Sequence, residues 1–263
     1  PDWAKGAVFY QIYVDRFANG DPSNDVLNRE YIYIKEPSKK IDDWYCYPEQ
    51  MDVRNFYGGD LQGVLDHLDY LKELGVDVIY LNPIFVSPSN HKYDIQDYDY
   101  IDPHYGKIVV DEGNTLPDWE NNNMNASKYI SRVTDKRNLE ASNEFFVHFV
   151  EEVHKKGMRV ILDGVFNHCG SFNKWMDAER IYENQYGYEK GAFVDANSPY
   201  RHFFKFYNQN AWPYNDDYDG WWGHKTLPKL NYEGSKELYD YILGIAAKWV
   251  SAPYYVDGWR LDV

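Results

Sequence analysis

The chain has 263 residues, of which 44% are hydrophobic. This is enough for one large domain with a substantial core, and it excludes a disordered chain. The 27 basic and 42 acidic residues give a net charge of −15, which argues against nucleic acid and anionic membrane as partners and suits neutral substrates or bound cations. No apolar run approaches the length of a transmembrane helix, and Cys46 and Cys169 form no disulfide framework, so both a secreted and a cytoplasmic location remain open.

Strands and helices alternate along the first part of the chain. Residues 8–14 form an apolar run that predicts a buried first strand. Asp60 is a good N-cap for a helix that Gly75 ends, and residues 76–81 predict the second strand. The apolar positions of this helix recur on one face: Leu61, Val64, Leu65, Leu68 and Leu71.

A polar stretch at about 107–138 follows the second strand. It contains few apolar residues, so it predicts an inserted loop that is partly mobile. The next helix is expected to be capped near Ser142 and to end at Gly157, and residues 160–162 predict the third strand.

The second part of the chain contains a long irregular region, about 167–234, that is dense in Tyr, Trp, Asn and Gly. A helix then starts at Ser235, and Tyr254 opens the fourth strand. This alternation predicts an α/β fold with parallel strands and crossover helices, and it corresponds to the first half of an eight-stranded barrel. The expected organisation is strands one to three in 1–166, an insertion in 167–234, and a helix and fourth strand in 235–263.

Charged side chains stand at the ends of the last two predicted strands. Arg260 and Asp262 are two residues apart, so both point to the same side of their strand, and the Arg favours the ionised form that an attacking carboxylate requires. The third strand likewise ends in Asp163, Asn167 and His168. These ends predict an active site at the C-terminal face of a parallel barrel.

Hard oxygen ligands gather in a short segment near the N-terminus. Asn19, Asp21, Asn24 and Asp25 fall within seven residues, and intervening Gly and Pro residues permit tight turns. Ca²⁺ takes about 6–8 such oxygens, so the cluster predicts a calcium site. The alternative is an Asx-rich turn whose side chains bond their own backbone.

Several of these segments carry a family resemblance. Residues 159–168 and 257–263 resemble the first two conserved regions of the α-amylase superfamily of glycoside hydrolases. The segments 19–25, 56–63, 87–94 and 227–231 are most similar to the neopullulanase, cyclomaltodextrinase and amylopullulanase group, although Leu227 stands where that group usually has Met. The resemblance implies the first half of a (β/α)8 TIM barrel, with 167–234 as a domain B after the third strand.

The resemblance also implies roles for individual residues. Asp262 would be the nucleophile and Arg260 its charge partner, with Asp163 as a structural acid near that Arg and Asn167 supporting the loop or a second cation. Substrate would be bound by aromatic stacking and by His side chains, through Tyr93, His91, His168, Trp221 and Trp222. Aromatic residues make up 18% of the chain, and Trp212, Trp221 and Trp222 could equally pack the insertion. Calcium would be held by Asn19, Asp21, Asn24, Asp25, Asp60 and the carbonyl of Gly58.

The activity implied by the resemblance is retaining hydrolysis of α-glucosidic bonds in maltodextrin, cyclodextrin or pullulan through a covalent glycosyl–enzyme intermediate. The general acid and the stabilising Asp would lie beyond Val263, on the remaining half of the barrel, so residues 1–263 alone are expected to be inactive. The expected partners are an α-glucan, that second barrel half and a second copy in a homodimer. Two alternatives remain open: a transglycosylase or sucrose-type isomerase that uses the same intermediate, and a non-catalytic glucan-binding barrel.

Overall fold

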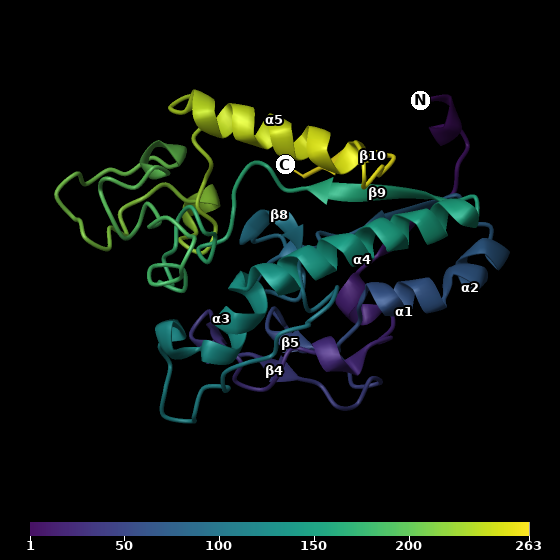
Figure 1. The fold of residues 1–263 in the computed structure, drawn as a ribbon, viewed down its shortest axis with the longest axis horizontal. Coiled ribbons are helices and arrows are strands. Elements are labelled where there is room, and N and C mark those ends of the chain that lie inside the picture. Colours follow the sequence, from purple (N-terminus) through teal and green to yellow (C-terminus); the bar gives the residue numbers. More distant parts are fainter. Residues whose placement is uncertain (263) are drawn as a thin grey trace.

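A four-stranded parallel sheet organises the chain (Figure 1). The computed structural model describes residues 1–262, so Val263, the last residue of the predicted fourth-strand segment, lies outside the described residues. The strands pair in the order β1-β6-β9-β10, and all three pairings are parallel. Their bounds are β1 Phe9–Ile12, β6 Val78–Leu81, β9 Arg159–Gly164 and β10 Gly258–Leu261. The predicted alternation of parallel strands and crossover helices is therefore confirmed.

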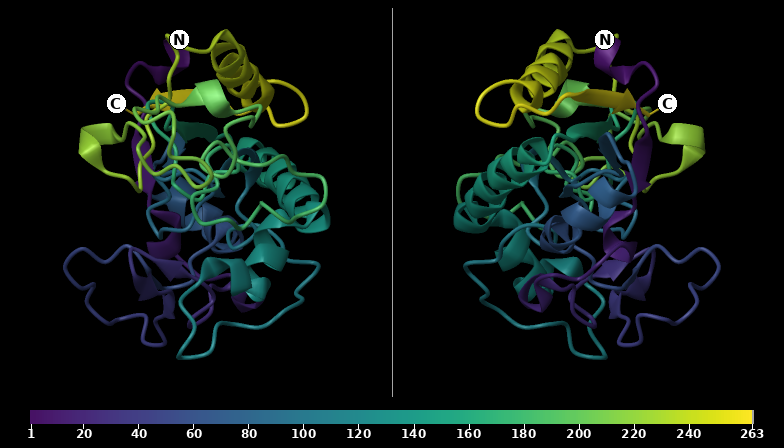
Figure 2. Two further views of the ribbon diagram at one scale, coloured as in Figure 1. Left: turned by 90° about the vertical axis from the view of Figure 1, so that its left-hand side faces the viewer. Right: turned by 90° about the vertical axis from the view of Figure 1, so that its right-hand side faces the viewer.

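The described helices are α1 Leu61–Asp66, α2 Leu68–Glu73, α3 Ser127–Thr134, α4 Lys136–Lys155 and α5 Lys236–Val250. All of them except α3, whose apolar residues belong to a second cluster, share one apolar core with the sheet. Apolar residues of α1, α2, α4 and α5 join those of β6 and β9 in a single buried cluster. Figure 2 shows α4 and α5 lying along the same side of the sheet. The Trp259 indole fastens β10 to α5 because its Nε1 donates to the carbonyl of Ala246 at 3.1 Å.

Short strands and 3₁₀ turns complete the structure. The short strands are β2 Ile32–Tyr33, β3 Glu36–Pro37, β4 Lys39–Lys40, β5 Asn55–Phe56, β7 Phe85–Val86 and β8 Asp97–Ile101. The 3₁₀ turns are Asp2–Ala4, Val14–Arg16, Pro22–Asn24, Asn123–Asn125, Arg201–Phe203 and Trp221–Gly223. Most of the short strands lie in connections that leave the C-terminal ends of β1 and β6, which is where the site described below is built.

Helix N-caps were predicted correctly at two of three positions. The Asp60 carboxylate accepts a hydrogen bond from the Gly63 amide, and the Ser235 hydroxyl accepts one from the Leu238 amide. The prediction of a cap near Ser142 was wrong, because α4 begins at Lys136 and is capped by Asp135. The Ser142 side chain is buried inside α4, where its hydroxyl bonds the backbone of residue 107 instead.

Other boundaries also differ from the predictions. The helix predicted to run from Leu61 to Gly75 is interrupted at His67, which separates α1 from α2. The segment 107–138, predicted as a loop, contains α3 and the first turn of α4. The fourth strand begins at Gly258, because the chain from Tyr254 is still in a turn.

A chain of buried charges attaches α3 to the rest of the fold. Lys92 Nζ lies 2.6 Å from the Asp102 carboxylate, which also contacts His104 at 2.8 Å. The other ring nitrogen of His104 lies 2.8 Å from Glu30, and Arg132 of α3 contacts the second oxygen of Glu30 at 2.9 Å. Burial alone would lower the pKa of His104, but Glu30 and Asp102 together raise it. A protonated His104 therefore bridges two buried carboxylates, each of which also has its own cation, Lys92 or Arg132.

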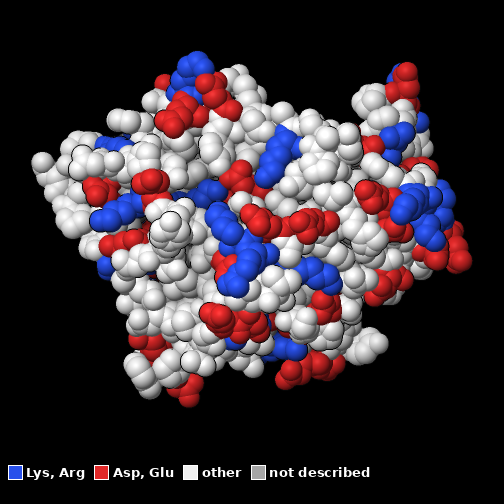
Figure 3. All heavy atoms as spheres, in the orientation of Figure 1, with Lys and Arg blue, Asp and Glu red and all other residues white. Residues whose placement is uncertain are grey.

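The region 167–234 has little regular structure but is not loosely attached. Several of its buried aromatic residues belong to the same core cluster as the sheet, among them Trp175, Phe203 and Phe206, whereas Phe172 and Tyr182 belong to a second cluster. On the face shown in Figure 3, acidic and basic side chains are interspersed, so the net charge of −15 is not gathered into one patch there. None of the helices in residues 1–262 has the length and apolar character that a membrane-spanning helix needs.

Candidate active site

Asp163, at the C-terminal end of β9, is the most heavily hydrogen-bonded acid at the strand ends. Its side chain is fully buried, and Tyr93 Oη donates to Oδ2 at 2.8 Å. Tyr80 Oη donates to the same oxygen, and Arg260 Nη1 reaches both oxygens at 3.2 and 3.3 Å. Burial raises the pKa of Asp163, while these donors oppose the rise. The protein itself thus supplies the donors for both oxygens of a buried acid.

Arg260 joins this acid to Asp262. The same Nη1 that contacts Asp163 donates to Asp262 Oδ1 at 2.5 Å. The Asp262 amide donates to the Gly164 carbonyl at 3.0 Å, which holds the residue beside the end of β9. The Asp262 side chain is 20% exposed, so its carboxylate remains accessible beside a fixed cation. The hydrogen bond to Asp262 is the main cause that raises the pKa of Arg260. The predicted neighbours Asp163, Arg260 and Asp262 are brought together by the fold.

Tyr80 belongs to this cluster but was missed by sequence reasoning. It lies in β6, within an apolar run in which a Tyr reads as core. In the structure its hydroxyl bonds Asp163, and burial together with that bond raises the pKa of Tyr80. The available signal was its position one residue before the end of a central strand, on the same rim as the predicted acids.

His168 forms one wall of the site. Its Nε2 lies 3.0 Å from the Tyr93 carbonyl, which can only accept, so Nε2 carries the proton. Its Nδ1 then accepts from the Asn167 side-chain amide at 3.2 Å. This arrangement describes a neutral ring, in keeping with burial, which lowers the pKa of His168. The Trp221 ring stacks on the imidazole, with centroids 5.0 Å apart and planes 21° apart.

His91 shapes the loop that carries Tyr93. Its Nδ1 accepts from the Tyr93 amide at 3.1 Å, and Ser89 Oγ lies 3.2 Å from the same nitrogen. Burial lowers the pKa of His91, which favours the neutral ring that these contacts need. The two rings lie 6.0 Å apart, so His91 and Tyr93 are placed together, as predicted.

The three candidate tryptophans have different surroundings. Trp221 stacks on His168 within the site, and the neighbouring Trp222 is 84% exposed. Trp212 packs against Phe206 and donates from its ring to the Ala192 carbonyl at 2.9 Å. The packing alternative therefore describes Trp212, whereas Trp221 and Trp222 border the site.

The oxygen-rich loop forms a second centre, next to the N-terminus of α1. Three of its oxygens are buried without a hydrogen-bond donor: Asn19 Oδ1, Asn24 Oδ1 and Asp25 Oδ2. Lys40 Nζ lies 2.5 Å from Asp25 Oδ2, so a cation bound at this oxygen would compete with the Lys40 ammonium. Buried polar atoms rarely lack partners, so such a cluster fits a ligand that supplies positive charge.

Other predicted calcium ligands are engaged within the protein. The Asp60 carboxylate accepts hydrogen bonds from the backbone amides of Gly20, Asp21 and Gly63 and from the Asn24 side chain. Asp60 therefore holds the oxygen-rich loop against the N-terminus of α1. Burial raises the pKa of Asp60 against these donors. The carboxylate of Asp21 is bonded by Ser23 and by Lys107.

Gly58 is a position where only glycine fits. Its φ is +86°, and a Cβ there would lie 2.4 Å from an Asp25 oxygen and 2.6 Å from the Asn19 amide. The backbone at Gly58 therefore packs directly on the oxygen cluster. In residues 1–262, no three His, Cys, Asp or Glu side chains gather as a metal centre, so this cluster depends on amide oxygens as well as carboxylates.

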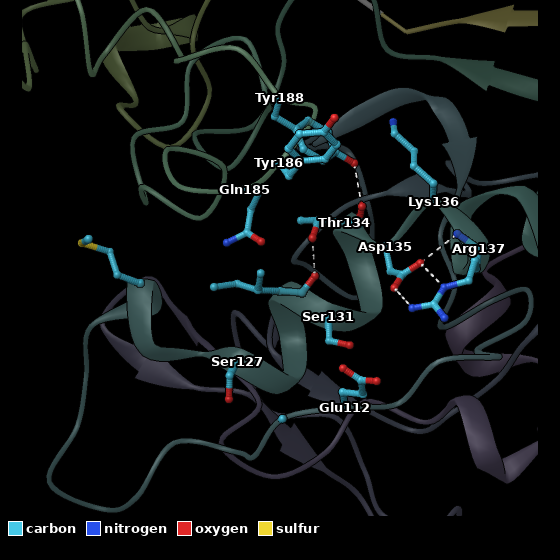
Figure 4. A pocket seen from close by; sticks show the side chains of 13 residues that line it. Glu112, Ser127, Ser131, Thr134, Asp135, Lys136, Arg137, Gln185, Tyr186 and Tyr188 are labelled. Carbon is cyan, nitrogen blue, oxygen red and sulfur yellow. Dashed lines mark hydrogen bonds and ion pairs between the residues drawn. The ribbon is translucent and has the colours of Figure 1, made fainter.

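A cavity of about 730 Å³ lies elsewhere, between α3 and residues 185–188 (Figure 4). In Figure 4, Gln185, Tyr186 and Tyr188 stand on one side, and Ser131 and Thr134 of α3 on the other. None of the predicted site residues lines it. This cavity is thus distinct from the strand-end cluster.

The chain is similar in sequence to known proteins. The family described as "Alpha amylase, catalytic domain" matches residues 11–112 and 141–263, which leaves out all of α3. The chain is 35% identical to an amylopullulanase of Thermoanaerobacter thermohydrosulfuricus, covering 100% of this chain and 17% of that protein. It is also 35% identical to an intracellular maltogenic amylase of Bacillus subtilis, covering 100% of this chain and 34% of that protein.

Solved structures agree with these matches. The type III pullulan hydrolase of Thermococcus kodakarensis superposes with a TM-score of 0.69 at 30% identity, over 100% of this chain and 38% of that one. A cyclic α-maltosyl-(1→6)-maltose hydrolase of Arthrobacter globiformis gives 0.68 at 32% identity, over 100% and 45% of the two chains. The chain spans about a third or less of the length of the two curated relatives described above.

Proposed function

Since this chain belongs to the α-amylase family, we propose that it forms the first half of a catalytic barrel that hydrolyses α-glucosidic bonds in starch-type glucans. The remaining four strands would come from the full-length protein. The region 167–234 would serve as domain B, because it follows β9 and places Trp221 against His168. The observation that carries the proposal is the cluster of Asp163, Arg260 and Asp262 at the ends of adjacent strands.

The half-barrel interpretation is supported by the sheet itself. Both outer strands, β1 and β10, have a free side in the order of the described sheet. Phe9 on β1 is 48% exposed and Leu261 on β10 is 64% exposed, which is unusual for large apolar residues in parallel strands. Four further strands would cover these residues and close the barrel.

In the proposed mechanism, a carboxylate oxygen of Asp262 bonds to the anomeric carbon as the glycosidic C–O bond breaks. The leaving oxygen takes its proton from a carboxylic acid that the rest of the full-length protein supplies, and water later displaces Asp262 with that group acting as base. Arg260 orients the Asp262 carboxylate, because its guanidinium donates to Asp262 Oδ1 at 2.5 Å. Asp163 acts through Arg260 by fixing the position of the guanidinium.

The sugar would lie between the ring faces of Tyr93 and Trp221. Flat aromatic faces cover sugar C–H surfaces, and both rings are only partly buried. His168 already donates Nε2–H to the Tyr93 carbonyl, so a sugar hydroxyl would replace Asn167 at Nδ1. Trp222 would extend the binding surface outward, and His91 would orient Tyr93 as well as bond substrate.

We also propose that the oxygen-rich loop binds Ca²⁺. Asn19, Asn24 and Asp25 would hold the ion through their donor-free oxygens, and the Gly58 carbonyl would lie close by. When bound, Ca²⁺ would supply structural cross-linking between these segments. Asp60 would continue to hold the loop rather than bind the ion, since its oxygens already accept four N–H hydrogen bonds.

The test is product analysis on the full-length protein, with wild type beside Asp262→Asn and with maltodextrin, cyclodextrin and pullulan as substrates. We expect α-anomeric products from wild type only, with the rate of the variant reduced by a factor of roughly 1,000 or more. Transfer products or an isomerised disaccharide would instead identify the transferase or isomerase alternative. A folded wild-type protein that binds glucan but releases no product would overturn the hydrolase proposal.

A separate assay on residues 1–263 would test the half-barrel interpretation. We expect no turnover from this segment, because the proton donor would come from the remaining barrel half. Hydrolysis by the purified segment, removed by Asp262→Asn, would contradict this proposal.

A further inference from the structure

An exposed aromatic loop, residues 42–51, projects from the connection between β1 and α1. Tyr45 is 90% exposed, Tyr47 is 92% exposed and Met51 is 80% exposed. Isolated apolar residues are common on protein surfaces, but three such side chains within seven positions form a patch. Water at an aromatic patch of this kind is readily displaced by a ligand with a flat apolar face.

This aromatic loop is anchored from beneath. The Tyr57 hydroxyl donates to the Cys46 carbonyl at 2.6 Å, and the Trp44 ring packs edge-on against Tyr57 with centroids 5.9 Å apart. The Asp43 carboxylate accepts from the Tyr45 amide at 3.0 Å. The backbone is therefore held in place while the two tyrosine rings stand in solvent.

The anchored end of the aromatic loop leads directly to the candidate active site. The Asn90 side-chain amide donates to the carbonyls of Asp52 and Asn55, both at 2.9 Å, and the Asn90 amide donates to the Val53 carbonyl at 2.9 Å. Asn90 immediately precedes His91, which orients Tyr93. In the left view of Figure 2, the aromatic loop and the turn that carries Trp221 project on the same side of the molecule.

We propose that the aromatic loop is an additional binding platform for an α-glucan chain that extends outward from the candidate active site, with Tyr45 and Tyr47 as its contact residues. The proposal rests on the function proposed above. Tyrosine suits this task because its ring covers sugar C–H groups and its hydroxyl bonds sugar hydroxyls. The loop also carries Asp42, Asp43 and Glu49 and no basic residue, so a neutral polyol fits it better than an anionic ligand.

If the aromatic loop binds glucan, the effect of its tyrosines on kcat/KM should depend on substrate length. In the full-length protein, Tyr45→Ala combined with Tyr47→Ala should lower kcat/KM for long maltodextrin roughly tenfold, through KM, because two stacking contacts are lost. Activity on maltotriose should stay within about twofold, because the proposed platform binds only sugars of a longer chain outside the cleavage point. The matched control is Tyr186→Ala, since Tyr186 is a fully exposed tyrosine beside the cavity of Figure 4. Equal losses on both substrates, or none on either, would overturn the platform.

Cys46 provides a second readout that does not need turnover. It is an exposed thiol within the aromatic loop, whereas Cys169 is buried. In the full-length Asp262→Asn protein, maltoheptaose should slow alkylation of Cys46 at least severalfold, measured by mass spectrometry of the peptide that contains it. The double tyrosine variant should lose this protection.

These outcomes separate the two proposals. If wild type hydrolyses no glucan yet maltoheptaose protects Cys46, the platform stands and the hydrolase proposal fails. If wild type is active but Cys46 is not protected, the platform is wrong. If Cys46 fails to react even without sugar, the aromatic loop is covered by protein in the full-length molecule, and that result also overturns the proposal.

Discussion

Buried side-chain oxygens have hydrogen-bond donors in the strand-end cluster, whereas several buried oxygens of the oxygen-rich loop have none. At the strand ends, Asp163 receives donors from two tyrosines and from Arg260, so both of its oxygens are satisfied by the protein. In the loop, oxygens of Asn19, Asn24 and Asp25 are buried without hydrogen-bond donors. The first centre is complete before any ligand binds, whereas the second keeps oxygens without donors, which is what the proposed cation would require.

The buried carboxyl group of Asp177 is a third case, in which only one oxygen has a hydrogen-bond donor. Its Oδ1 accepts from the Tyr182 amide at 3.1 Å, but Oδ2 is buried without a partner. Burial raises the pKa of Asp177 to about 8. A buried carboxyl in this fold can thus be satisfied by donors, by a cation or by a proton, and each solution responds to a different experimental change.

The largest expected effect is at the donor-rich centre. Asp163→Asn keeps the shape of the side chain but removes the charge that holds Arg260, so activity should fall roughly 100-fold through misplacement of the guanidinium. Stability to urea should change by only about 1 kcal/mol, because Arg260 is 44% exposed and burial opposes the charge on Asp163. The control is Asp257→Asn, which breaks an Asp–Arg pair with Arg159 at the opposite end of the sheet. Its kcat should stay near wild type; equal kcat losses in both variants would show a general effect of destabilisation.

The oxygen-rich loop should respond to calcium. At 100 times the Kd, Ca²⁺ should raise the free energy of unfolding by about 2.7 kcal/mol relative to chelator, measured by thermal and urea unfolding. Asp25→Asn should abolish most of this gain, and Lys40→Met should tighten binding because the ammonium near Asp25 competes with the ion. Asp118→Asn, at a fully exposed acid, is the control. Identical unfolding curves with calcium and with chelator would refute the cation site.

Asp177 should make stability depend on pH. Its folded pKa lies above the unfolded value, so the protonated form stabilises the native state at low pH, and this contribution is lost as pH rises towards 8. Asp177→Asn does not titrate, so its stability relative to wild type should increase by roughly 3 kcal/mol between pH 5 and pH 8. Urea unfolding of both proteins at several pH values measures this difference. A constant difference across the range would show that Asp177 is already ionised in the folded protein.

The smallest effect is expected from Tyr80→Phe. It removes one of two tyrosine donors from Asp163 Oδ2, and Tyr93 still bonds the same oxygen. The loss of one hydrogen bond, about 1 kcal/mol, should lower kcat/KM roughly fivefold. Tyr93→Phe provides the comparison, since it removes the other donor but keeps the ring. A 100-fold loss in Tyr80→Phe alone would mean that the donors are not interchangeable.

Sequence patterns predicted the elements that depend on local chemistry. The N-caps Asp60 and Ser235 and the four parallel strands follow from side-chain spacing and from capping residues, because these signals act within a few positions. The start of α4 could not be read in this way. Ser142 has the chemistry of a cap, but its hydroxyl is used by the backbone of residue 107, which is distant in sequence.

The sequence by itself determined the family resemblance, the α/β alternation and the grouping of Asp163, Arg260 and Asp262, since residues at the ends of adjacent parallel strands must meet. Only the tertiary structure decided that Tyr80 belongs to this group, which required the register of β6 beside β9. It also decided which loop oxygens lack donors, because burial and hydrogen bonding are set by segments far apart in the chain. Sequence patterns are set by neighbouring residues, whereas the hydrogen bonds of a buried polar atom depend on the whole fold.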